Sequence, residues 1–294
     1  SLVISFLIFN TFLTMKKLVA LLLLPFLLFS CKKDDTQVAL TVQVTNVDQP
    51  SDKSAISEVS EIHTVTLLFF RQDNHNLVCE EHQSRADFTG DDAANFGVFN
   101  VELSVGAYDM VVLGYRHDSP VTVNAYNSVT FPYTHMVYST KQSVSVTASG
   151  TSTISATLSR ITSQFRIITT DQIPAGVESV RISFSKGGTT LNPMTDLATT
   201  DAGCATTISG FSARVGENPS VNSNLLLYAD EQTMNVLVEV LDASNNVVIS
   251  HNFENLPFKR NRRTYVTGPL YHQGSASNFD VNTSWIDEYN GGTF

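Results

Sequence analysis

Short segments of alternating apolar and polar residues repeat along this 294-residue chain and set its fold class. The first runs from Gln37 to Val44, and its inward face would carry Val38, Leu40, Val42 and Val44. A period of two residues is typical of a half-buried strand. After residue 30, no stretch of ten or more residues has helical periodicity. The pattern therefore predicts an all-β fold, with many short strands packed as β-sandwiches.

Further strands are expected at regular intervals. His63–Phe70 is apolar on both faces, as in a central strand. Hairpins are predicted where two apolar runs flank a short turn, at Phe99–Val105 with Tyr108–Tyr115, Ser143–Ala148 with Thr151–Leu158, and Met234–Leu241 with Val247–Phe253. Single strands are predicted at Phe165–Thr170, Val180–Phe184 and Leu225–Tyr228, and a polar loop at Asp48–Ser60. Pro257 predicts an edge strand or a break.

The strand pattern restarts after Arg160, which suggests two domains. We expect an N-terminal β-sandwich domain at residues 37–159 and a C-terminal one at residues 160–294, each of ordinary domain size. The last alternating segment lies at residues 278–285 and places four residues on one face, namely Phe279, Val281, Thr283 and Trp285.

The first 30 residues are predicted to be a signal peptide. Met15-Lys16-Lys17 precedes an almost wholly apolar run that ends at Ser30, and we take residues 1–14 as an over-extended start of the reading frame. The run is short for a membrane-spanning helix, which needs about 20 apolar residues. Leu28-Phe29-Ser30-Cys31 resembles the lipobox of bacterial lipoproteins, although Phe29 is bulkier than the usual occupant. That resemblance implies cleavage after Ser30 and lipidation of Cys31. The alternative is an ordinary secretory signal with an incidental cysteine.

Residues 31–36 are expected to be a tether. More than one acyl chain on Cys31 would hold the protein durably at a membrane without any transmembrane helix. Lys33, Asp34 and Asp35 resemble a short export signal that sends lipoproteins to the outer face of the outer membrane in one group of Gram-negative bacteria. The alternative is a solvated linker that carries no export signal. We expect a lipid-anchored, cell-surface protein of the outer membrane.

The charge balance excludes one class of partner. Lys16 and Lys17 are the only charged residues among the first 30, so 16 basic and 28 acidic residues follow them, a net charge of −12. Nucleic acids and anionic lipids both favour positively charged surfaces. We therefore expect no nucleic-acid partner.

No catalytic motif is apparent, and the sequence predicts neither an enzyme nor a cofactor. The nucleophile elbow, the His-Glu-x-x-His motif and the glycine-rich nucleotide loops are all missing from the sequence. One polar cluster could suggest a metal site, but zinc ligands usually come as two tight pairs. Its members are His75, Cys79, Glu80, Glu81 and His82. We interpret that cluster as a polar hairpin end and expect no metal. Cys79 and Cys204 could pair in an oxidising compartment, yet two free thiols are the favoured reading.

Two other groupings have structural and functional readings. Lys259-Arg260-Asn261-Arg262-Arg263 is the one concentrated positive segment, which we interpret as a charged strand edge that discourages unwanted pairing. An aromatic group could offer a platform for sugar rings, but core or edge packing is the favoured reading. Its members are Tyr126, Phe131, Tyr133 and Tyr138.

Three segments resemble the fimbrillin family, lipoprotein subunits and anchors of type V pili. They are Leu158–Ile167, the segment Leu256–Thr264 before Gly268, and Phe99–Tyr115. The resemblance covers most of residues 36–287 and implies two transthyretin-like β-sandwich domains. It also implies assembly by strand donation, in which a subunit loses its first strand by proteolysis after an arginine and accepts a strand from the next subunit. Here Gln37–Val44 would be the strand lost, and residues 278–285 the donor.

The sequence departs from that pattern at the cleavage position. No arginine lies between Cys31 and Arg71, and the intervening loop offers only Lys53. An uncut subunit could donate a strand but not accept one, so we expect an anchor or terminal subunit of a fimbrium. Its partners would be other fimbrial subunits, the outer membrane through the lipid, and a host surface protein or glycan in cell adhesion. The alternative is a non-polymerising, glycan-binding surface lipoprotein of a nutrient-uptake system, and fold does not decide between them.

Overall fold

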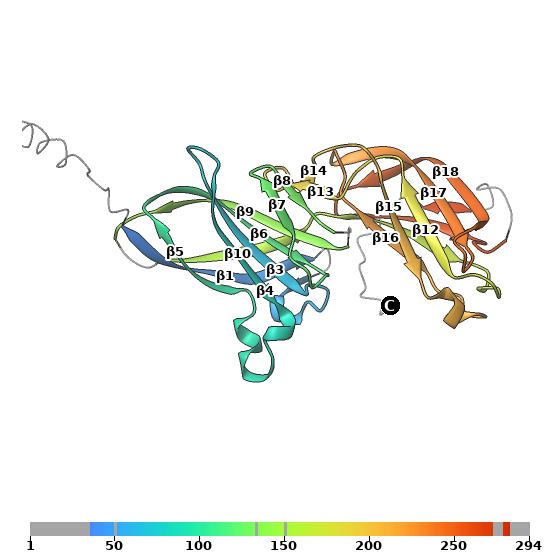
Figure 1. Cartoon of the computed structure of the whole chain (residues 1–294), viewed down its shortest axis with the longest axis horizontal. Coiled ribbons are helices and arrows are strands. Elements are labelled where there is room, and N and C mark those ends of the chain that lie inside the picture. Colours follow the sequence, from blue (N-terminus) through green and yellow to red (C-terminus); the bar gives the residue numbers. More distant parts are fainter. Residues whose placement is uncertain (1–35, 50–51, 133–134, 150–151, 273–278, 283–294) are drawn as a thin grey trace, which may run out of the picture. The chain divides into compact units, whose positions relative to one another are not determined.

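The computed structural model describes residues 36–49, 52–132, 135–149, 152–272 and 279–282 (Figure 1). Gln37–Phe294 forms one compact unit. As predicted, the fold is all-β, because its described residues form strands, turns and short 3₁₀ helices without an α-helix. Nowhere in these ranges is a helix long and apolar enough to cross a membrane. The predicted signal peptide and its site residues Ser30, Cys31, Lys33, Asp34 and Asp35 lie outside the described residues.

One eight-stranded sheet makes up the N-terminal half. Its order is β2-β1-β10-β9-β6-β3-β4, and β5 also pairs with β1, on the edge opposite β10. The strands are β1 (Gln37–Gln49), β2 (Asp52–Ser54), β3 (Thr64–Arg71), β4 (Leu77–Ser84), β5 (Val98–Ser104), β6 (Gly106–Tyr115), β9 (Val137–Val146) and β10 (Ser152–Arg160). β9 and β10 share only the pairs Ser139–Ser159 and Tyr138–Arg160. The sheet therefore divides there into two layers around one core, to which β1 and β6 both contribute.

Two four-stranded sheets pack on a second core in the C-terminal half. One has the order β16-β11-β19-β20 and the other β15-β12-β17-β18. The strands are β11 (Ser163–Thr169), β12 (Ser179–Phe184), β15 (Cys204–Ser209), β16 (Val221–Leu225), β17 (Glu231–Leu241), β18 (Val247–Lys259), β19 (Arg263–Gly268) and β20 (Asp280–Asn282). Phe165 of β11 contacts Phe184, Phe253 and Phe258 from the facing sheet, with ring centroids 6.0–6.2 Å apart. This face-to-face arrangement is a β-sandwich.

A fourth sheet is built from both halves of the chain. Its strands are β7 (Thr122–Ala125), β8 (Ser128–Thr130), β13 (Thr190–Asn192) and β14 (Leu197–Ala198). Strand β8 pairs with β13 through Thr130–Thr190 and Val129–Leu191. Buried side chains from β3, β6 and β9 pack beneath this sheet together with Leu191 and Leu226. A third core thus joins the two halves, which the sequence pattern did not predict.

The predicted hairpin between Phe99 and Tyr115 is wrong. Strand β5 pairs with β1, whereas β6 pairs with β3 and β9. Leu103 of β5 and Tyr108 of β6 nevertheless belong to the same core. An alternating pattern on either side of a short turn fits a hairpin and also a corner at which the chain crosses from one layer to the other. The Tyr108 hydroxyl donates to the Ser104 carbonyl at 2.7 Å across this corner.

Other predicted elements vary in their outcome. The central strand at His63–Phe70 and the pairing of Met234–Leu241 with Val247–Phe253 are confirmed, and β18 carries Pro257 on an edge strand. The strand expected at Leu225–Tyr228 is wrong, because β16 ends at Leu225. The loop expected at Asp48–Ser60 instead holds the end of β1, strand β2 and a 3₁₀ helix. The 3₁₀ helices are η2 (Ile56–Glu58), η3 (Arg85–Asp87), η4 (Gly90–Asn95) and η5 (Phe211–Arg214).

Candidate functional site: the first and last described strands and a polar pocket

Strand β1 is hydrogen-bonded along both edges. It pairs antiparallel with β5 from Gln37–Ser104 to Gln43–Val98, and parallel with β10 from Leu40–Ser152 onward. As predicted, one face of β1 is buried, with exposed fractions of 6% or less at Val38, Leu40, Val42 and Val44. A fully buried Val or Leu contributes about 1.5–3 kcal/mol, so these four side chains represent several kcal/mol of stability.

The chain that follows β1 is held by Arg85. Its guanidinium donates to the carbonyls of Ile62, Ile56 and Val59 at 2.7–2.8 Å, and it lies 4.4 Å from the centroid of the Phe96 ring. Burial lowers the pKa of Arg85 against a smaller opposing effect of the Glu61 carboxylate. Hydrogen bonds to a charged donor are stronger than neutral ones. Arg85 therefore anchors η2 and the residues up to β3.

Lys53, the one basic residue of the predicted loop, lies in a strand. Strand β2 turns back on the end of β1 and pairs Lys53 with Asp48 and Ser54 with Val47. Arg71 ends β3, which β4 and β6 flank. Lys53 therefore does not lie in the open loop that the sequence suggested, whereas Arg71 ends a central strand. A protease needs an accessible, extended segment, so this pairing disfavours cleavage behind β1.

Two glutamine side chains bridge the strands where backbone pairing stops. Gln83 of β4 donates to the Val98 carbonyl at 2.7 Å and accepts from the Gly97 N–H at 2.7 Å. Gln142 of β9 donates to the Ser155 carbonyl of β10 at 3.0 Å. The primary amide thus supplies the donor and acceptor that a neighbouring strand would supply. In this way the Val98 carbonyl and the Gly97 N–H are hydrogen-bonded to β4, although β4 and β5 do not pair through their backbones.

Within the described part of the chain, strand β20 covers residues 280–282 and is paired along one edge. Its pairs with β19 are Tyr265–Asn282, Val266–Val281 and Thr267–Asp280. The preceding Phe279 is 6% exposed, and its ring lies 5.0 Å from those of His251 and Phe253. Val281 remains 45% exposed.

Of the four predicted donor residues, then, the structure places two and brings Phe279 into the core of its own half. Thr283 and Trp285 lie outside the described residues.

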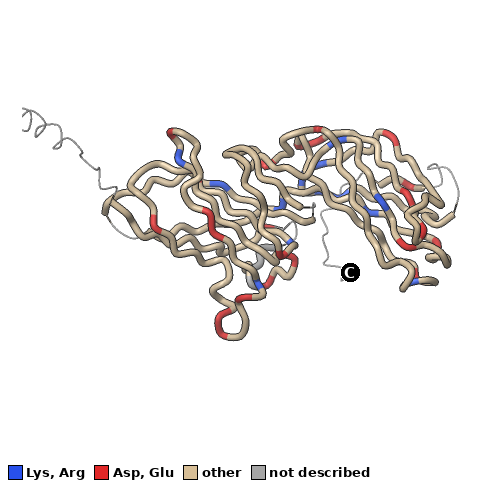
Figure 2. Tube along the Cα trace, viewed as in Figure 1, with Lys and Arg blue, Asp and Glu red and all other residues tan. Residues whose placement is uncertain are grey.

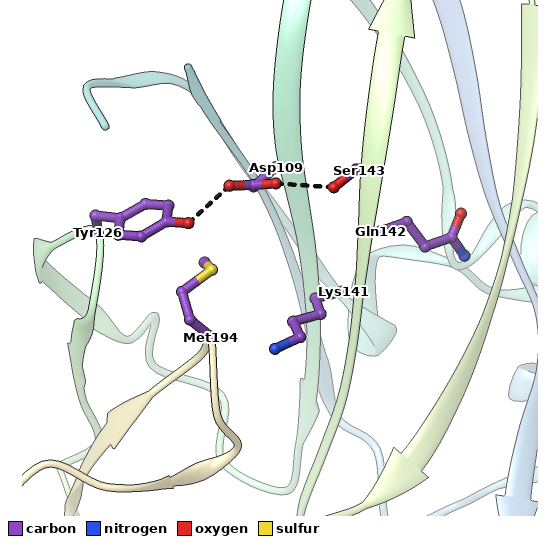
Figure 3. Close-up of a pocket in the computed structure, with 6 residues that line it drawn as sticks. All are labelled: Asp109, Tyr126, Lys141, Gln142, Ser143 and Met194. Atoms are coloured by element: carbon purple, nitrogen blue, oxygen red, sulfur yellow. Dashed lines mark hydrogen bonds between the residues drawn. The ribbon is translucent and has the colours of Figure 1, made fainter. Parts of the chain in front are cut away.

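A polar pocket of about 320 Å³ lies against the outer face of β6 and β9 (Figure 3). At its centre, the Asp109 carboxylate accepts hydrogen bonds from Tyr126 at 2.7 Å, Gln72 at 2.8 Å and Ser143 at 3.1 Å. Tyr126 belongs to the turn between β7 and β8. Lys141 of β9 and Met194 of the β13–β14 turn complete the wall. Sequence reasoning noted Tyr126 but missed the rest, because the residues come from four separate segments.

Hydrogen bonding sets the electrostatics of this pocket. Desolvation alone would raise the pKa of Asp109, but the hydrogen bonds from Tyr126, Gln72 and Ser143 together lower it. The same bond to Asp109 raises the pKa of Tyr126 to about 12, with burial as a second cause. The His75 ring stacks on Tyr126 with centroids 4.1 Å apart. At neutral pH the pocket therefore holds a carboxylate and a neutral phenol in fixed positions.

The other predicted groupings are dispersed over the fold. In the possible metal cluster, His75 stacks on Tyr126, whereas His82 pairs with Glu80 at 3.1 Å on edge strand β4. In the described ranges, no group of three or more His, Cys, Asp or Glu is placed to hold a metal ion. Cys79 and Cys204 are free thiols, in the N-terminal and C-terminal halves respectively.

The basic segment forms the tight turn between β18 and β19. Lys259 pairs with Glu231, and Arg260 with Asp230 at 2.7 Å. Asn261, in a left-handed conformation, accepts from Arg160 at 2.8 Å. Lys259 ends β18, an edge strand of its sheet, and the charges of Lys259 and Arg260 also have partners within the fold. Figure 2 shows acidic and basic positions along the trace.

The aromatic group is divided in the same way. Phe131 and Tyr138 are buried, as predicted, with exposed fractions of 2% and 1%. Tyr126 is half-buried and lines the pocket, so it alone of the described members meets solvent. Tyr133 lies outside the described residues.

Comparison with known sequences assigns a family but no function. Residues 120–293, more than half of the chain, match a family described as "Family of unknown function (DUF6562)". The matched segment starts just before β7 and so includes the shared sheet and the whole C-terminal half. No protein with curated function matches the sequence.

Solved structures with a similar fold come from Bacteroides and Porphyromonas. A chain from Bacteroides thetaiotaomicron, described as one of the "putative polysaccharide binding proteins (DUF1812)", is 13% identical over 84% of this chain and 96% of its own, with a TM-score of 0.52. The fimbrial anchor protein Mfa2 from Porphyromonas gingivalis is 10% identical over 84% of this chain and 95% of its own, with a TM-score of 0.48. At such low identity, the first likeness shows a shared fold and leaves function open.

Proposed function

The chain belongs to the DUF6562 family of unknown function, and we propose that it is a cell-surface fimbrial subunit of the anchor or terminal type. In this proposal Cys31 carries the lipid that holds the protein at the outer membrane. The subunit assembles by giving a strand to its neighbour and supports adhesion. The fimbrillin-like sequence segments and the all-β sandwich fold support the proposal.

The observation that carries the proposal is the double pairing of β1. A subunit that accepts a strand must first lose its own, and here that loss would break two ladders and expose four buried side chains. The chain behind β1 is paired in β2 and anchored by Arg85. It also lacks the arginine at which related subunits would be cut. A subunit that keeps β1 keeps its connection to Cys31, as an anchor must.

The C-terminal segment has the properties needed of a donor. Strand β20 is held by three residue pairs on one edge. Its alternating pattern continues in the sequence through Thr283 and Trp285. Strand addition uses backbone hydrogen bonds for affinity and alternate side chains for register. Release of these three pairs would break fewer described backbone contacts than release of β1.

The first test is the chemical state of the protein in its native outer membrane. We expect an N-terminus at Cys31 with acyl groups attached, and an intact mass that includes β1. A mature protein that begins near Ser54, recovered from sheared filaments, would contradict the anchor role.

The second test concerns the donor segment. Deletion of residues 283–294 leaves Phe279 and Val281 in place, and we expect it to abolish co-purification with other fimbrial subunits. Thermal unfolding should stay close to that of the parent, because the described core is intact. Tyr228→Ala, at a 50% exposed site away from β20, is the matched control. Unchanged co-purification after the deletion would contradict donation by this segment.

A further inference from the structure

The pocket beside Asp109 has hydrogen-bonding capacity that the fold does not use. The ammonium group of Lys141 makes no hydrogen bond to the described residues, and Lys141 is exposed. Among the described residues, Oδ2 of Asp109 accepts only the Tyr126 hydroxyl, which leaves one of its acceptor positions open. Three donor positions and one acceptor position are therefore available across one small space.

These groups are fixed by the sheet and not by a mobile loop. Asp109 and Ser143 are direct partners in the β6–β9 ladder, and Lys141 lies opposite Val111. Alternation places Asp109, Lys141 and Ser143 on one face of the sheet. Gln142 points to the other face, where its amide binds the Ser155 carbonyl (Figure 3). Sites built on strands hold their geometry better than sites on loops.

Two hairpin turns supply the apolar part of the pocket. The ring of Tyr126 is pinned by its bond to Asp109, by the stacked His75 ring and by Phe70 at 5.4 Å. The thioether of Met194 faces the same space from the β13–β14 turn (Figure 3). One turn comes from each half of the chain, so the pocket depends on the shared sheet that joins them.

The mixture of charges selects the class of ligand. A simple anion would be drawn to Lys141 but repelled by Asp109, and a simple cation would meet the opposite conflict. Hydroxyl groups satisfy both residues, because each hydroxyl donates and accepts. A volume of about 320 Å³ is at the lower end of small-molecule sites, which suits one ring and not a long chain. The apolar C–H face of a sugar ring also matches the side chains of Tyr126 and Met194.

We propose that this pocket binds a single neutral pyranose unit of a glycan, with Asp109 and Lys141 bonding its hydroxyls. Asp109, Ser143 and Gln72 form a preorganised polar wall, and Lys141 donates to ring substituents from the open side. This activity is independent of strand donation. A fimbrial subunit and a non-polymerising surface protein could each use it.

The test uses the full chain with Cys31→Ser, which blocks lipidation and leaves the described residues unchanged. Met194 is labelled with a ¹³C methyl group and followed by NMR during titration with glucose, galactose, mannose and N-acetylglucosamine. We expect at least one of these sugars to shift the Met194 methyl resonance in a saturable manner. Met194→Ala assigns that resonance among the five methionines of the chain.

Substitutions identify the residues that bind. Lys141→Ala and Asp109→Asn should each weaken the best sugar about ten-fold, the equivalent of about 1.4 kcal/mol. Lys186→Ala, at an exposed lysine outside the pocket, should leave the affinity unchanged. The unfolding temperature of each variant is measured and compared with that of the parent, to show that the variant is folded.

Three outcomes would overturn the proposal. They are no shift with any of the four sugars, a shift that Lys141→Ala does not weaken, and saturable binding of a zwitterionic amino acid such as glycine in place of the sugars. Because lipidation and fimbrial assembly are not involved in this assay, its failure would leave the proposed anchor function unaffected.

Discussion

The first and last described strands of this protein are held in opposite ways. Strand β1 spans 13 residues and is paired along both edges, whereas the described part of β20, residues 280–282, is paired along one edge. Strand β1 buries the apolar face that its alternate side chains form, whereas all three residues of β20 are exposed, Val281 to 45%. An alternating sequence thus identifies a strand, but its number of paired edges decides whether it can leave.

This difference has a direct functional meaning. A strand fixed on two edges is part of its own domain, and a strand fixed on one short edge is available for exchange with another chain. Under the proposed anchor role, β1 stays in its own subunit and the C-terminal segment is the one that is donated. The following predictions test that difference, and Cys79 and Cys204 report on the two halves separately because each packs against a different core.

The largest expected effect is on thiol reactivity. Burial raises the pKa of Cys79 to about 11, with Glu81 and Glu80 adding to the shift, and burial alone raises that of Cys204 to about 11. The thiolate is the reactive form, so at pH 8 both should alkylate about 100-fold more slowly than an unperturbed thiol. Iodoacetamide labelling of Cys31→Ser chains with Cys79→Ser or Cys204→Ser measures each rate. Rapid labelling of either folded variant would contradict this.

Leu40→Ala should cost about 3 kcal/mol of unfolding free energy, because it leaves a cavity under a strand that cannot shift. Urea unfolding measures the loss. Gln43→Ala, on the exposed face of the same strand, should change the free energy by less than about 0.5 kcal/mol. In Leu40→Ala, iodoacetamide labelling of Cys79 should accelerate more than labelling of Cys204. Equal acceleration of the two would show that the halves unfold together.

Arg85→Met should cost about 2 kcal/mol, because three carbonyls lose a charged donor while the apolar contact with Phe96 is kept. We also expect trypsin to cut faster at Lys53 than in the parent, as seen by mass spectrometry. The matched control is Arg181→Met, which removes an ion pair with Glu239 in the C-terminal half. Unchanged cleavage at Lys53 would mean that Arg85 does not protect the segment behind β1.

Phe279→Ala should cost about 1–2 kcal/mol, less than a typical core phenylalanine, because the short strand can detach and leave the remaining core closed. Val281→Ala, at a half-exposed site, should cost less than about 0.5 kcal/mol. In Phe279→Ala, amide hydrogen exchange should be faster along β19 and unchanged along β1. A loss of unfolding free energy as large as that of Leu40→Ala would contradict the view that β20 is weakly held.

The smallest effect concerns acid. The folded-state pKa of Asp109 is lowered, so its contribution to stability is present above the unfolded value of about 3.9 and is lost as the pH falls through the folded value. As the pH is lowered from 5 to 2, the unfolding temperature should therefore fall slightly more steeply in the parent than in Asp109→Asn. Parallel curves would show that the hydrogen bonds to Asp109 do not favour its ionised form.

Local pattern was enough for the properties of single strands and of one hairpin. The β17–β18 hairpin and the buried face of β1 follow from alternation and turn residues, and the central β3 follows from a run that is apolar on both faces. The same reasoning failed at Phe99–Tyr115, because a corner between layers has the pattern of a hairpin. It also missed β13 and β14, which are three and two residues long. Strand β13 pairs with β14 and with β8 from the other half.

By itself, the sequence determined that this protein is all-β, that Val38, Leu40, Val42 and Val44 share a buried face, and that the aromatic residues Phe131 and Tyr138 pack inside. These are properties of single strands, in which side chains alternate and apolar surface avoids water. Only the tertiary structure decided that β1 has two partners and β20 one, that Arg85 holds the chain behind β1, and that Asp109, Tyr126, Lys141 and Met194 meet. Those facts depend on pairings between residues far apart in the chain, and no local period encodes them.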